Sequence, residues 1–103
     1  MFGSITAIEL KKRLQNGEVI LIDVREAEEY KMARIQGSYW IPLLEITLEK
    51  LPSRSRPIVI HCASGKRSQE ACRKLLAQDP TLEIYNLEGG INAWKSGADS
   101  LNS

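Results

Sequence analysis

The sequence has few of the residues that bind metal ions or form cross-links. Its 103 residues include one histidine, His61, and two cysteines, Cys62 and Cys72. These are too few for the ligand set of a structural zinc site, so no metal is predicted. A disulfide is not expected either. Cys62 ends a predicted strand and Cys72 lies about one turn inside the following helix, where bridge geometry would be fortuitous.

The sequence also lacks an excess of one charge and any long apolar run. Lysine and arginine total 14 against 13 aspartates and glutamates, so no nucleic-acid partner is predicted. No apolar run approaches the roughly 20 residues that span a bilayer, which excludes a membrane-spanning role. The N-terminus has no basic region followed by an apolar stretch, so it does not resemble a signal peptide. The expected location is the cytoplasm.

The length fits a single domain over residues 1–103. Hydrophobic residues make up 43% of the chain and charged residues 26%, which is typical of a globular protein rather than a disordered one. Residues from about 97 to 103 are expected to form a frayed tail. Such a tail is also compatible with the chain being one piece of a longer polypeptide.

Helical and strand patterns alternate along the chain. Val19–Val24 and Ile58–Cys62 are apolar at nearly every position, which indicates strands buried on both faces, as in parallel sheets. The remaining predicted strands are residues 38–43 and 82–87. Helical patterns cover residues 6–16, 26–33, 43–51, 68–78 and 91–96, the first with a capping box formed by Thr6 and Glu9. This alternation predicts an α/β domain with a mainly parallel sheet and helices on both faces.

Cys62 lies where ligands bind in open parallel sheets, at the carboxyl end of a strand and directly before a helix. The intervening Ala63, Ser64, Gly65, Lys66 and Arg67 form a short loop whose backbone N–H groups can curl around one point as an anion-binding nest. The helix from Ser68 adds its own unpaired N–H groups, and the two cations add full charges. All of these favour a thiolate, so we predict that Cys62 is a nucleophile.

Cys62, the adjacent His61 and the second cysteine, Cys72, each allow more than one interpretation. Many cysteines at strand ends are small core residues, but the glycine, the cations and the helix start favour chemistry at Cys62. His61 should face away from Cys62, because adjacent strand residues point to opposite faces, and we expect a structural role for it. Cys72 lies on the apolar face of its helix and is predicted to be core, with a resolving thiol as the alternative.

Three segments resemble motifs of the rhodanese (sulfurtransferase) family, single-domain type, and the likeness covers nearly the whole chain. LIDVREAEEY at residues 21–30 is similar to the family's Asp-x-Arg segment, and HCASGKRS at 61–68 to its active-site loop. LEGGINAW at 87–94 is similar to its C-terminal signature. The last is the most distinctive, because secondary-structure propensity alone gives little reason for the Gly89-Gly90 pair followed by Asn92 and Trp94.

The resemblance implies a three-layer fold with a central parallel five-stranded sheet flanked by helices. It also implies that the Cys62 thiolate takes a sulfane sulfur from a donor such as thiosulfate, and that cyanide or a thiol then removes it from the persulfide. No cofactor is needed for this exchange. The amides of Ala63 to Ser68 would stabilise the thiolate and the persulfide, and Lys66 would steer anionic donors.

The resemblance also implies supporting roles. The loop arginine of relatives often turns inward to an acidic residue, so Arg67 is expected to brace the loop against Glu26 or Asp23, with direct contact to the substrate as the alternative. Asp23 and Arg25 are expected to form a helix N-cap and a structural ion pair, and Trp94 a core anchor. The chain departs from the family where Ala33 and Arg34 replace a usual Gly-His. Arg34 then either adds positive potential near the cleft or points to solvent.

Another departure follows the nucleophile directly, where Ala63 stands in place of the arginine of many relatives, so donor choice can differ.

Two alternative functions stay open. A phosphatase or arsenate reductase of the same fold would space the cysteine and arginine by five residues, whereas only four separate Cys62 from Arg67 here. A dedicated persulfide carrier that docks on a protein acceptor would share every motif described above. The sequence does not separate that carrier from a general sulfurtransferase.

Overall fold

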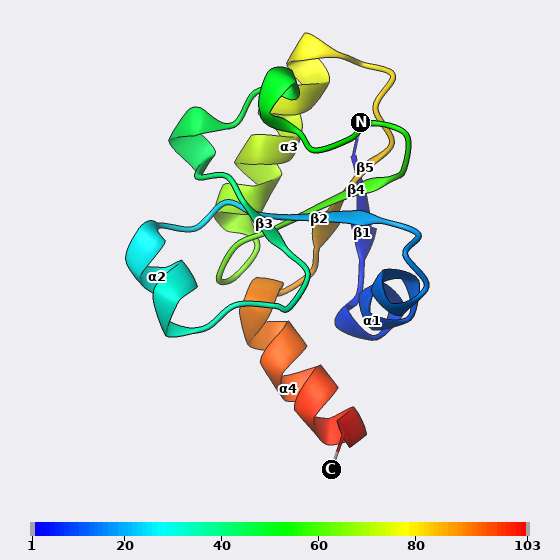
Figure 1. Cartoon of the computed structure of the whole chain (residues 1–103), viewed down its shortest axis with the longest axis vertical. Coiled ribbons are helices and arrows are strands. Elements are labelled where there is room, and N and C mark those ends of the chain that lie inside the picture. Colours follow the sequence, from blue (N-terminus) through cyan, green and yellow to red (C-terminus); the bar gives the residue numbers. More distant parts are fainter. Residues whose placement is uncertain (1, 103) are drawn as a thin grey trace.

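The computed structural model describes residues 2–102, with the side chains of residues 2–96. Its centre is a five-stranded parallel sheet with the strand order β1-β5-β4-β2-β3 (Figure 1). The strands are β1 (Gly3–Ile5), β2 (Ile20–Asp23), β3 (Tyr39–Trp40), β4 (Ile58–His61) and β5 (Ile84–Leu87). The helices are α1 (Ala7–Gln15), α2 (Ala27–Met32), α3 (Lys66–Gln78) and α4 (Gly90–Asn102). Two single turns of 3₁₀-helix, η1 (Leu43–Glu45) and η2 (Leu48–Lys50), lie between β3 and β4. The predicted α/β fold with a parallel sheet is therefore confirmed.

The middle of the sheet is buried on both faces. Every residue of β2 and β4 is buried, as their continuous apolar runs predict, and Ile22 pairs with Ile60 at the centre of the register. Burial on both faces leaves two separate cores, one on each side of the sheet.

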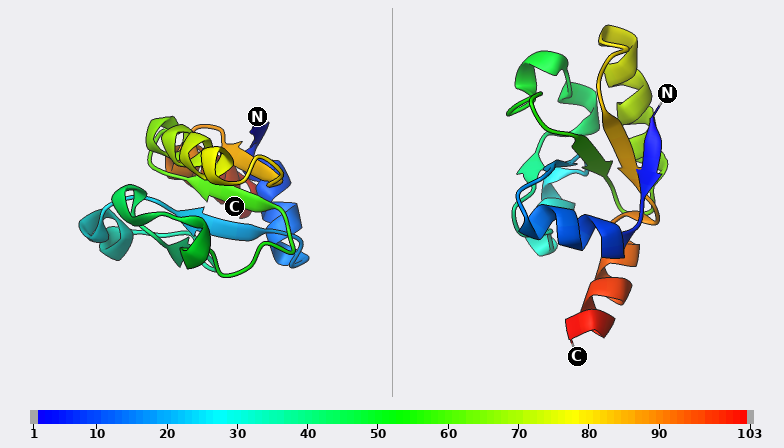
Figure 2. Two further views of the ribbon diagram at one scale, coloured as in Figure 1. Left: turned by 90° about the horizontal axis from the view of Figure 1, so that it is seen from above. Right: turned by 90° about the vertical axis from the view of Figure 1, so that its right-hand side faces the viewer.

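Different helices supply the two cores. On one side α3, η1 and η2 cover the sheet, and Ala71, Cys72 and Leu75 of α3 pack against Ile58 and Ile60 of β4. On the other side α1 and α4 cover it, contributing Leu10 and Ile91 to the core. Trp94 packs on this second core as a partly buried side chain, in agreement with its predicted anchoring role. Figure 2 shows the arrangement from two further directions.

The N-terminal strand is an element that the periodicity analysis missed. β1 has three residues and runs along the edge of the sheet beside β5, with Gly3 opposite Tyr85. A strand this short carries no periodic signal of its own. A Cβ at Gly3 would lie 2.8 Å from a Tyr85 ring carbon, so glycine at this position leaves room for the Tyr85 ring.

Four of the five predicted helices are present with shifted bounds. The capping box of α1 is formed by Thr6 and Glu9 as expected. The segment predicted to be helical over residues 43–51 contains only η1 and η2. α3 begins at Lys66 rather than at Ser68, because Gly65 takes a left-handed backbone (φ 110°) and serves as its N-cap. The backbone of α4 continues to Asn102, so the predicted frayed tail lies mostly in a helix whose side chains beyond residue 96 are outside the described part.

Candidate functional site

The thiol of Cys62 is enclosed by the loop that follows it. Cys62 comes directly after β4, and two later residues, Gly65 and Ser68, lie within hydrogen-bonding distance of its sulfur. The backbone N–H of Gly65 donates to Sγ at 3.1 Å, and the Ser68 hydroxyl lies 3.4 Å from Sγ. Cys62 is 1% exposed. The loop therefore forms a cradle that curls around the sulfur and buries the thiol almost completely.

Two opposing effects act on the ionisation of Cys62. Burial raises the pKa of the thiol, because the charged form loses its hydration. Hydrogen bonds from the Ser68 hydroxyl and from the amides of Ser68, Gly65 and Ser64 lower it. The hydrogen bonds outweigh the burial, and the pKa of Cys62 falls below its ordinary value. The loop thus favours a thiolate, as an anion-binding nest should.

The start of α4 holds the cradle from the other side. The backbone N–H of Ile91 donates to the Cys62 carbonyl at 2.9 Å, and that of Asn92 donates to the Ala63 carbonyl at 3.2 Å. These contacts require Gly90, because a Cβ there would collide with the carbonyl oxygens of Cys62 and Ala63. The second glycine of the Gly89-Gly90 pair therefore has a structural reason: it lets the N-terminus of α4 reach the nucleophile's backbone.

Asn86 belongs to the site although sequence reasoning did not select it. It lies in the middle of β5, is 5% exposed, and its Oδ1 accepts a hydrogen bond from the Ser68 hydroxyl. The same hydroxyl lies 3.1 Å from the Gly65 carbonyl oxygen. The available signal was a polar residue between Tyr85 and Leu87 in a strand whose other residues are apolar or aromatic, because a buried amide needs a hydrogen-bond partner.

Arg67 braces the loop, but not against either of the predicted partners. Its two terminal nitrogens donate to the carboxylate of Glu29 at 2.6 and 2.9 Å, in the first turn of α2. This correction has a simple cause, since Asp23 is already paired with Arg25 and Glu26 is an exposed N-cap residue. The Glu26 backbone N–H donates to the same Glu29 carboxylate at 3.0 Å.

Asp23 and Arg25 form the predicted structural ion pair. The Arg25 side chain donates to Asp23 from Nε and Nη2, the latter at 2.8 Å, and Nη2 also donates to the Ala33 carbonyl at 2.6 Å. Asp23 is not the N-cap of α2, which is Glu26; its carboxylate instead accepts from the Arg25 backbone N–H. Both side chains are almost fully buried, so the pair holds the segment after β2 in place.

His61 lies in the same buried network. Its Nε2 is 3.5 Å from the Asp23 carboxylate and its Nδ1 is 3.3 Å from the Cys62 carbonyl oxygen. Burial lowers the pKa of His61, while the Asp23 charge opposes that change. The ring thus contacts an acid on the neighbouring strand and the backbone of Cys62, which agrees with its predicted structural role.

The replacement of Gly-His by Ala33 and Arg34 leaves an exposed cation. Arg34 lies over the ring of Tyr30 at 4.7 Å, and that ring stacks on Trp40 at 5.7 Å. The Trp40 indole N–H in turn donates to the Arg25 carbonyl at 2.8 Å. Arg34 is therefore neither wholly in solvent nor part of the cradle, but the outer layer of a stack on the segment after β2.

Cys72 shares the core on the α3 side with Cys62, and both are free thiols. Burial raises the pKa of Cys72 to about 12, so it stays protonated at neutral pH. Across the described residues no group of three or more His, Cys, Asp or Glu side chains gathers in a way that could hold a metal ion.

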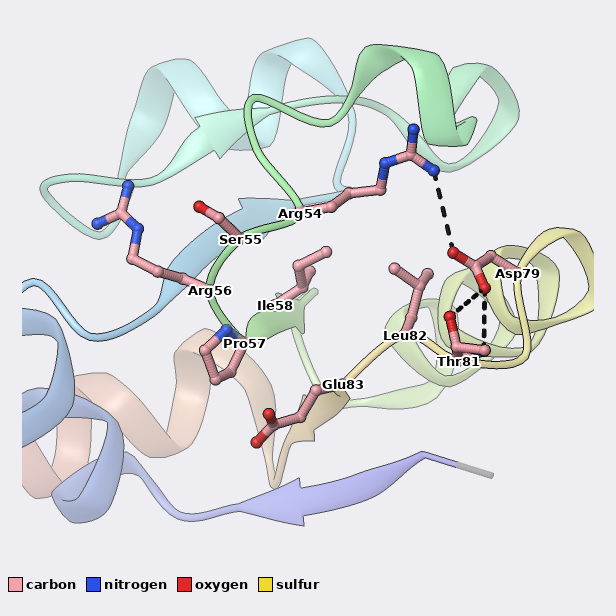
Figure 3. Close-up of a pocket in the computed structure, with 9 residues that line it drawn as sticks. All are labelled: Arg54, Ser55, Arg56, Pro57, Ile58, Asp79, Thr81, Leu82 and Glu83. Carbon is pink, nitrogen blue, oxygen red and sulfur yellow. Dashed lines mark hydrogen bonds and ion pairs between the residues drawn. The ribbon is translucent and has the colours of Figure 1, made fainter.

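Two further hollows mark the surface near the ends of the strands. A pocket of about 290 Å³ lies at the amino ends of β4 and β5, where Arg54 approaches Asp79 (Figure 3). It is at the opposite end of β4 from Cys62. A smaller pocket of about 200 Å³, lined by Val24, Leu43 and Leu44 among others, reaches Arg67 beside the cradle. Within the described part of the chain no helix is long and apolar enough to cross a membrane.

Comparisons with known proteins agree with this geometry. A protein named sulfurtransferase from Allochromatium vinosum is 36% identical over 91% of this chain and 89% of its own. A protein of Drosophila grimshawi named adenylyltransferase and sulfurtransferase MOCS3 is 31% identical over 92% of this chain, which spans only 23% of that relative.

Solved structures and a family profile lead to the same family. A rhodanese-related protein of Thermoplasma volcanium superposes with a TM-score of 0.77 at 29% identity, covering 93% of each chain. A Bacillus anthracis protein described as reduced CoADR-RHD superposes with a TM-score of 0.82 at 29% identity, covering 96% of this chain and 17% of that one. The sequence profile described as "Rhodanese-like domain" matches residues 6–97, and the chain therefore belongs to the rhodanese-like domain family.

Proposed function

We propose that this protein is a sulfurtransferase that carries sulfane sulfur on Cys62. Family membership and a relative named sulfurtransferase support sulfur transfer in general. The single observation that carries the proposal for this chain is the cradle, in which backbone amides and a hydroxyl lower the pKa of a buried cysteine. A thiolate in such a site is a nucleophile at neutral pH.

The first half-reaction uses thiosulfate as the donor. The Cys62 thiolate attacks the outer sulfur of thiosulfate, an S–S bond forms to Sγ, and the old S–S bond breaks with its electron pair leaving on sulfite. The products are a cysteine persulfide with one negative charge and the sulfite dianion, so charge and atoms balance. The amides of Ser64, Gly65 and Ser68, which hydrogen-bond the Cys62 sulfur, would stabilise the anion before and after the transfer.

The second half-reaction returns the enzyme to its starting state. Cyanide attacks the outer sulfur of the persulfide, and the bond to Sγ breaks with its electron pair returning to the Cys62 thiolate. Thiocyanate leaves, and a thiol can act as the acceptor in the same way. Neither step changes the number of protons on the protein or needs a metal or an organic cofactor.

The burial of Cys62 favours small reactants. A thiol that is 1% exposed reacts only when the loop around it moves, and a small opening admits thiosulfate or cyanide more readily than a bulky reactant. The exposed Ser64 and Lys66 border that approach, and Lys66 supplies a cation for a dianionic donor. A protein acceptor would need the persulfide to extend outward past these residues.

A dedicated persulfide carrier is the second candidate. The relative named adenylyltransferase and sulfurtransferase MOCS3 contains a region similar to this chain within a much longer protein, and we take this as support for a carrier that works with a protein partner. The two candidates share the first half-reaction here and differ only in the acceptor.

The hydrogen-bond partners of Arg67 argue against phosphate ester hydrolysis. Arginine recognises phosphate by pointing paired N–H groups at its oxygens. Here both terminal nitrogens of Arg67 are directed at Glu29 instead. Together with the short spacing between Cys62 and Arg67, this supports a cradle sized for one sulfur rather than for a tetrahedral phosphate.

Intact-mass measurement tests the proposal directly. After incubation with thiosulfate, the protein should gain one sulfur atom on Cys62, and cyanide should remove it with release of thiocyanate. C62S should gain none, whereas C72S should behave as the unchanged protein. Transfer to cyanide much slower than transfer to a protein thiol would favour the carrier. Hydrolysis of an aryl phosphate without any mass gain would overturn the proposal.

A further inference from the structure

The Ser68 hydroxyl has more acceptors around it than it has protons. Its oxygen lies 3.4 Å from Cys62 Sγ and 3.1 Å from the Gly65 carbonyl oxygen, and it donates to Asn86 Oδ1. A serine hydroxyl carries one proton and two lone pairs. When that proton points at Asn86, the hydroxyl gives no hydrogen bond to Cys62. It can then only accept one from the S–H of a neutral thiol.

Resting on the function proposed above, we propose that Asn86 is a positioning residue that turns the Ser68 hydroxyl toward Cys62 Sγ when that sulfur is charged and away when it is neutral. The carboxamide suits this task because one end accepts and the other end donates. In the thiolate state the chain of hydrogen bonds runs from Asn86 Nδ2–H to Ser68 Oγ–H to Sγ. In the neutral state it runs in the reverse direction and ends on Asn86 Oδ1.

Simple rotation of Ser68 alone would leave a conflict. If the hydroxyl proton turned to Sγ while Asn86 kept its oxygen in place, two oxygen lone pairs would face each other at hydrogen-bonding distance. A half-turn of the amide replaces that oxygen by an N–H group and removes the conflict. An aspartate in this position has no donor end, and an aliphatic residue has neither end.

The reaction requires both states in every cycle. Before sulfur transfer the negative charge is on Sγ, where a donated hydrogen bond lowers its energy. After transfer Sγ is a neutral divalent sulfur and the charge lies on the outer sulfur. The Ser68 hydroxyl then has no charged partner on Sγ and returns to Asn86 Oδ1.

Because Ser68 and Asn86 are buried, the partner that orients the Ser68 hydroxyl is Asn86 rather than water. Asn86 is 5% exposed and Ser68 is fully buried, between β5 and α3. On its strand Asn86 pairs in register with Ser4 of β1 and Ile60 of β4. An aliphatic side chain would fit such a place, so a buried amide there needs a compensating function.

Two other ionisable groups, Arg67 and Cys72, act on Cys62 without involving Ser68 or Asn86. Arg67 interacts with Cys62 only electrostatically, because its hydrogen bonds go to Glu29, and Cys72 lies in the same core as Cys62. Neither touches the Ser68–Asn86 pair through a hydrogen bond among the described residues. Their influence should be the same in every Asn86 variant.

Threonine and valine at position 86 provide a matched pair. Both are β-branched, have the same shape and suit a strand, but only threonine has a hydroxyl that donates and accepts. The pH dependence of Cys62 alkylation by iodoacetamide reports how easily the thiolate forms. N86V should be ~3- to 10-fold slower than N86T at pH 7, with the two rates converging at high pH, as expected for the loss of one hydrogen bond.

Aspartate tests the direction of the effect. N86D keeps the acceptor and the shape but removes the donor, so alkylation at pH 7 should fall by about 10-fold or more. Single-turnover sulfite release from thiosulfate should fall with it. Thiocyanate release from the persulfide should fall as well, because the bond to Sγ breaks in that step and the negative charge returns to this sulfur.

The coupling to Ser68 separates positioning from a general structural role. In an S68A background the difference between N86V and N86T should disappear, because Asn86 acts only through the hydroxyl. An equal difference with and without Ser68, or a pH profile of N86D identical to that of the unchanged protein, overturns the inference. Urea unfolding of each variant checks that it is folded.

Failure of the proposed function would be recognised separately. If the unchanged protein gains no sulfur from thiosulfate, sulfur transfer fails, whereas the alkylation profiles still test the pairing of Asn86 with Ser68.

Discussion

The guanidinium of Arg67 donates two hydrogen bonds to the carboxylate of Glu29, with N–O distances of 2.6 and 2.9 Å. The two residues are 38 positions apart, one directly after the loop around Cys62 and the other in the first turn of α2. α2 has no buried side chain. The ion pair therefore links a helix with little packing of its own to the loop that surrounds the thiol.

This pair should make stability depend on pH in the acid range. The hydrogen bond from Arg67 lowers the pKa of Glu29 from 4.5 to about 2. A carboxyl whose pKa is depressed by folding contributes stability above its unfolded pKa, and that contribution is lost as the pH falls from 4.5 through 2. The loss should be about 1 kcal/mol, since the two side chains are about one-third exposed and solvent screens the pair.

Urea denaturation at pH 5 and pH 2.5 measures this contribution. R67M should lack the part of the pH dependence that belongs to Glu29. K50M, which removes the exposed pair with Glu45, serves as the control and should keep it. Identical pH dependence in R67M and the unchanged protein would show that Glu29 is not held by Arg67 in solution.

The two cysteines should differ strongly in reactivity. The pKa of Cys62 is lowered by its hydrogen bonds against the effect of burial, while burial raises that of Cys72 to about 12. At pH 8 the thiolate fraction of Cys62 should therefore be far larger than that of Cys72. Peptide mapping after brief treatment with iodoacetamide should place the label on Cys62. Comparable labelling of Cys72 would contradict the assignment of the nucleophile.

Gly90 should tolerate no side chain. A Cβ there would collide with the carbonyl oxygens of Cys62 and Ala63, and its φ of 57° already disfavours other residues. G90A should lower the free energy of unfolding by about 3 kcal/mol or more and displace the cradle, as overpacking and strain together do. Urea denaturation and the rate of sulfite release measure the two effects.

Gly17 supplies the matched control for Gly90. Its φ of 69° is similar, but a Cβ there would meet nothing within 4 Å. G17A should therefore show the backbone strain alone, about 1 kcal/mol, with transfer unchanged. Equal effects of G90A and G17A would mean that contact with the carbonyl oxygens does not matter.

His61 should make the protein less stable in mild acid. Burial lowers the pKa of His61 below 6.5, with Asp23 opposing the change. Below pH 6.5 the unfolded chain then binds a proton that the folded protein does not, so stability present above that pH is lost as the pH falls. The urea midpoint should drop between pH 7.5 and 5.5, and the drop should be smaller in H61Q. A steeper drop in H61Q would reverse the sign of this assignment.

Lys66 should affect donor binding more than the chemical step. It is exposed at the first position of α3, beside the loop that surrounds the sulfur. K66A should raise KM for thiosulfate by about 3- to 10-fold with little change in kcat, and added salt should reduce the difference. K12A, on exposed α1 surface, is the control. An unchanged KM in K66A would remove Lys66 from the approach path.

Much of the fold could be predicted because a strand that is buried on both faces has a continuous run of apolar residues in the sequence. β2 and β4 are continuous apolar runs, and the capping box before α1 consists of residues three positions apart. β1 escaped prediction because three residues at a sheet edge show no period, and the partner that makes them a strand is β5, far along the chain. Residues 43–51 have helical spacing, yet form only single turns separated by extended backbone at Ile46 and Thr47.

The candidate site also has one part that the sequence predicted and other parts that it did not. The loop around Cys62 was predicted because glycine, two cations and a helix start follow one another in the sequence, and local backbone geometry follows from local residues. The partner of Arg67 was predicted wrongly, since nearby acids are candidates by proximity in sequence while α2 places only Glu29 against the guanidinium. The amide at position 86 gave no local sign of its contact with Ser68.

By itself, the sequence determined the alternation of strands and helices, the loop after Cys62 and the conformation that its glycine permits, because each depends on residues within one turn or one strand. Only the tertiary structure decided that the thiol is almost fully buried, that Glu29 holds Arg67, and that Gly90 and Asn86 complete the site. These relationships join segments far apart in the chain. They arise when the two cores pack against the sheet, and no local pattern of residues encodes them.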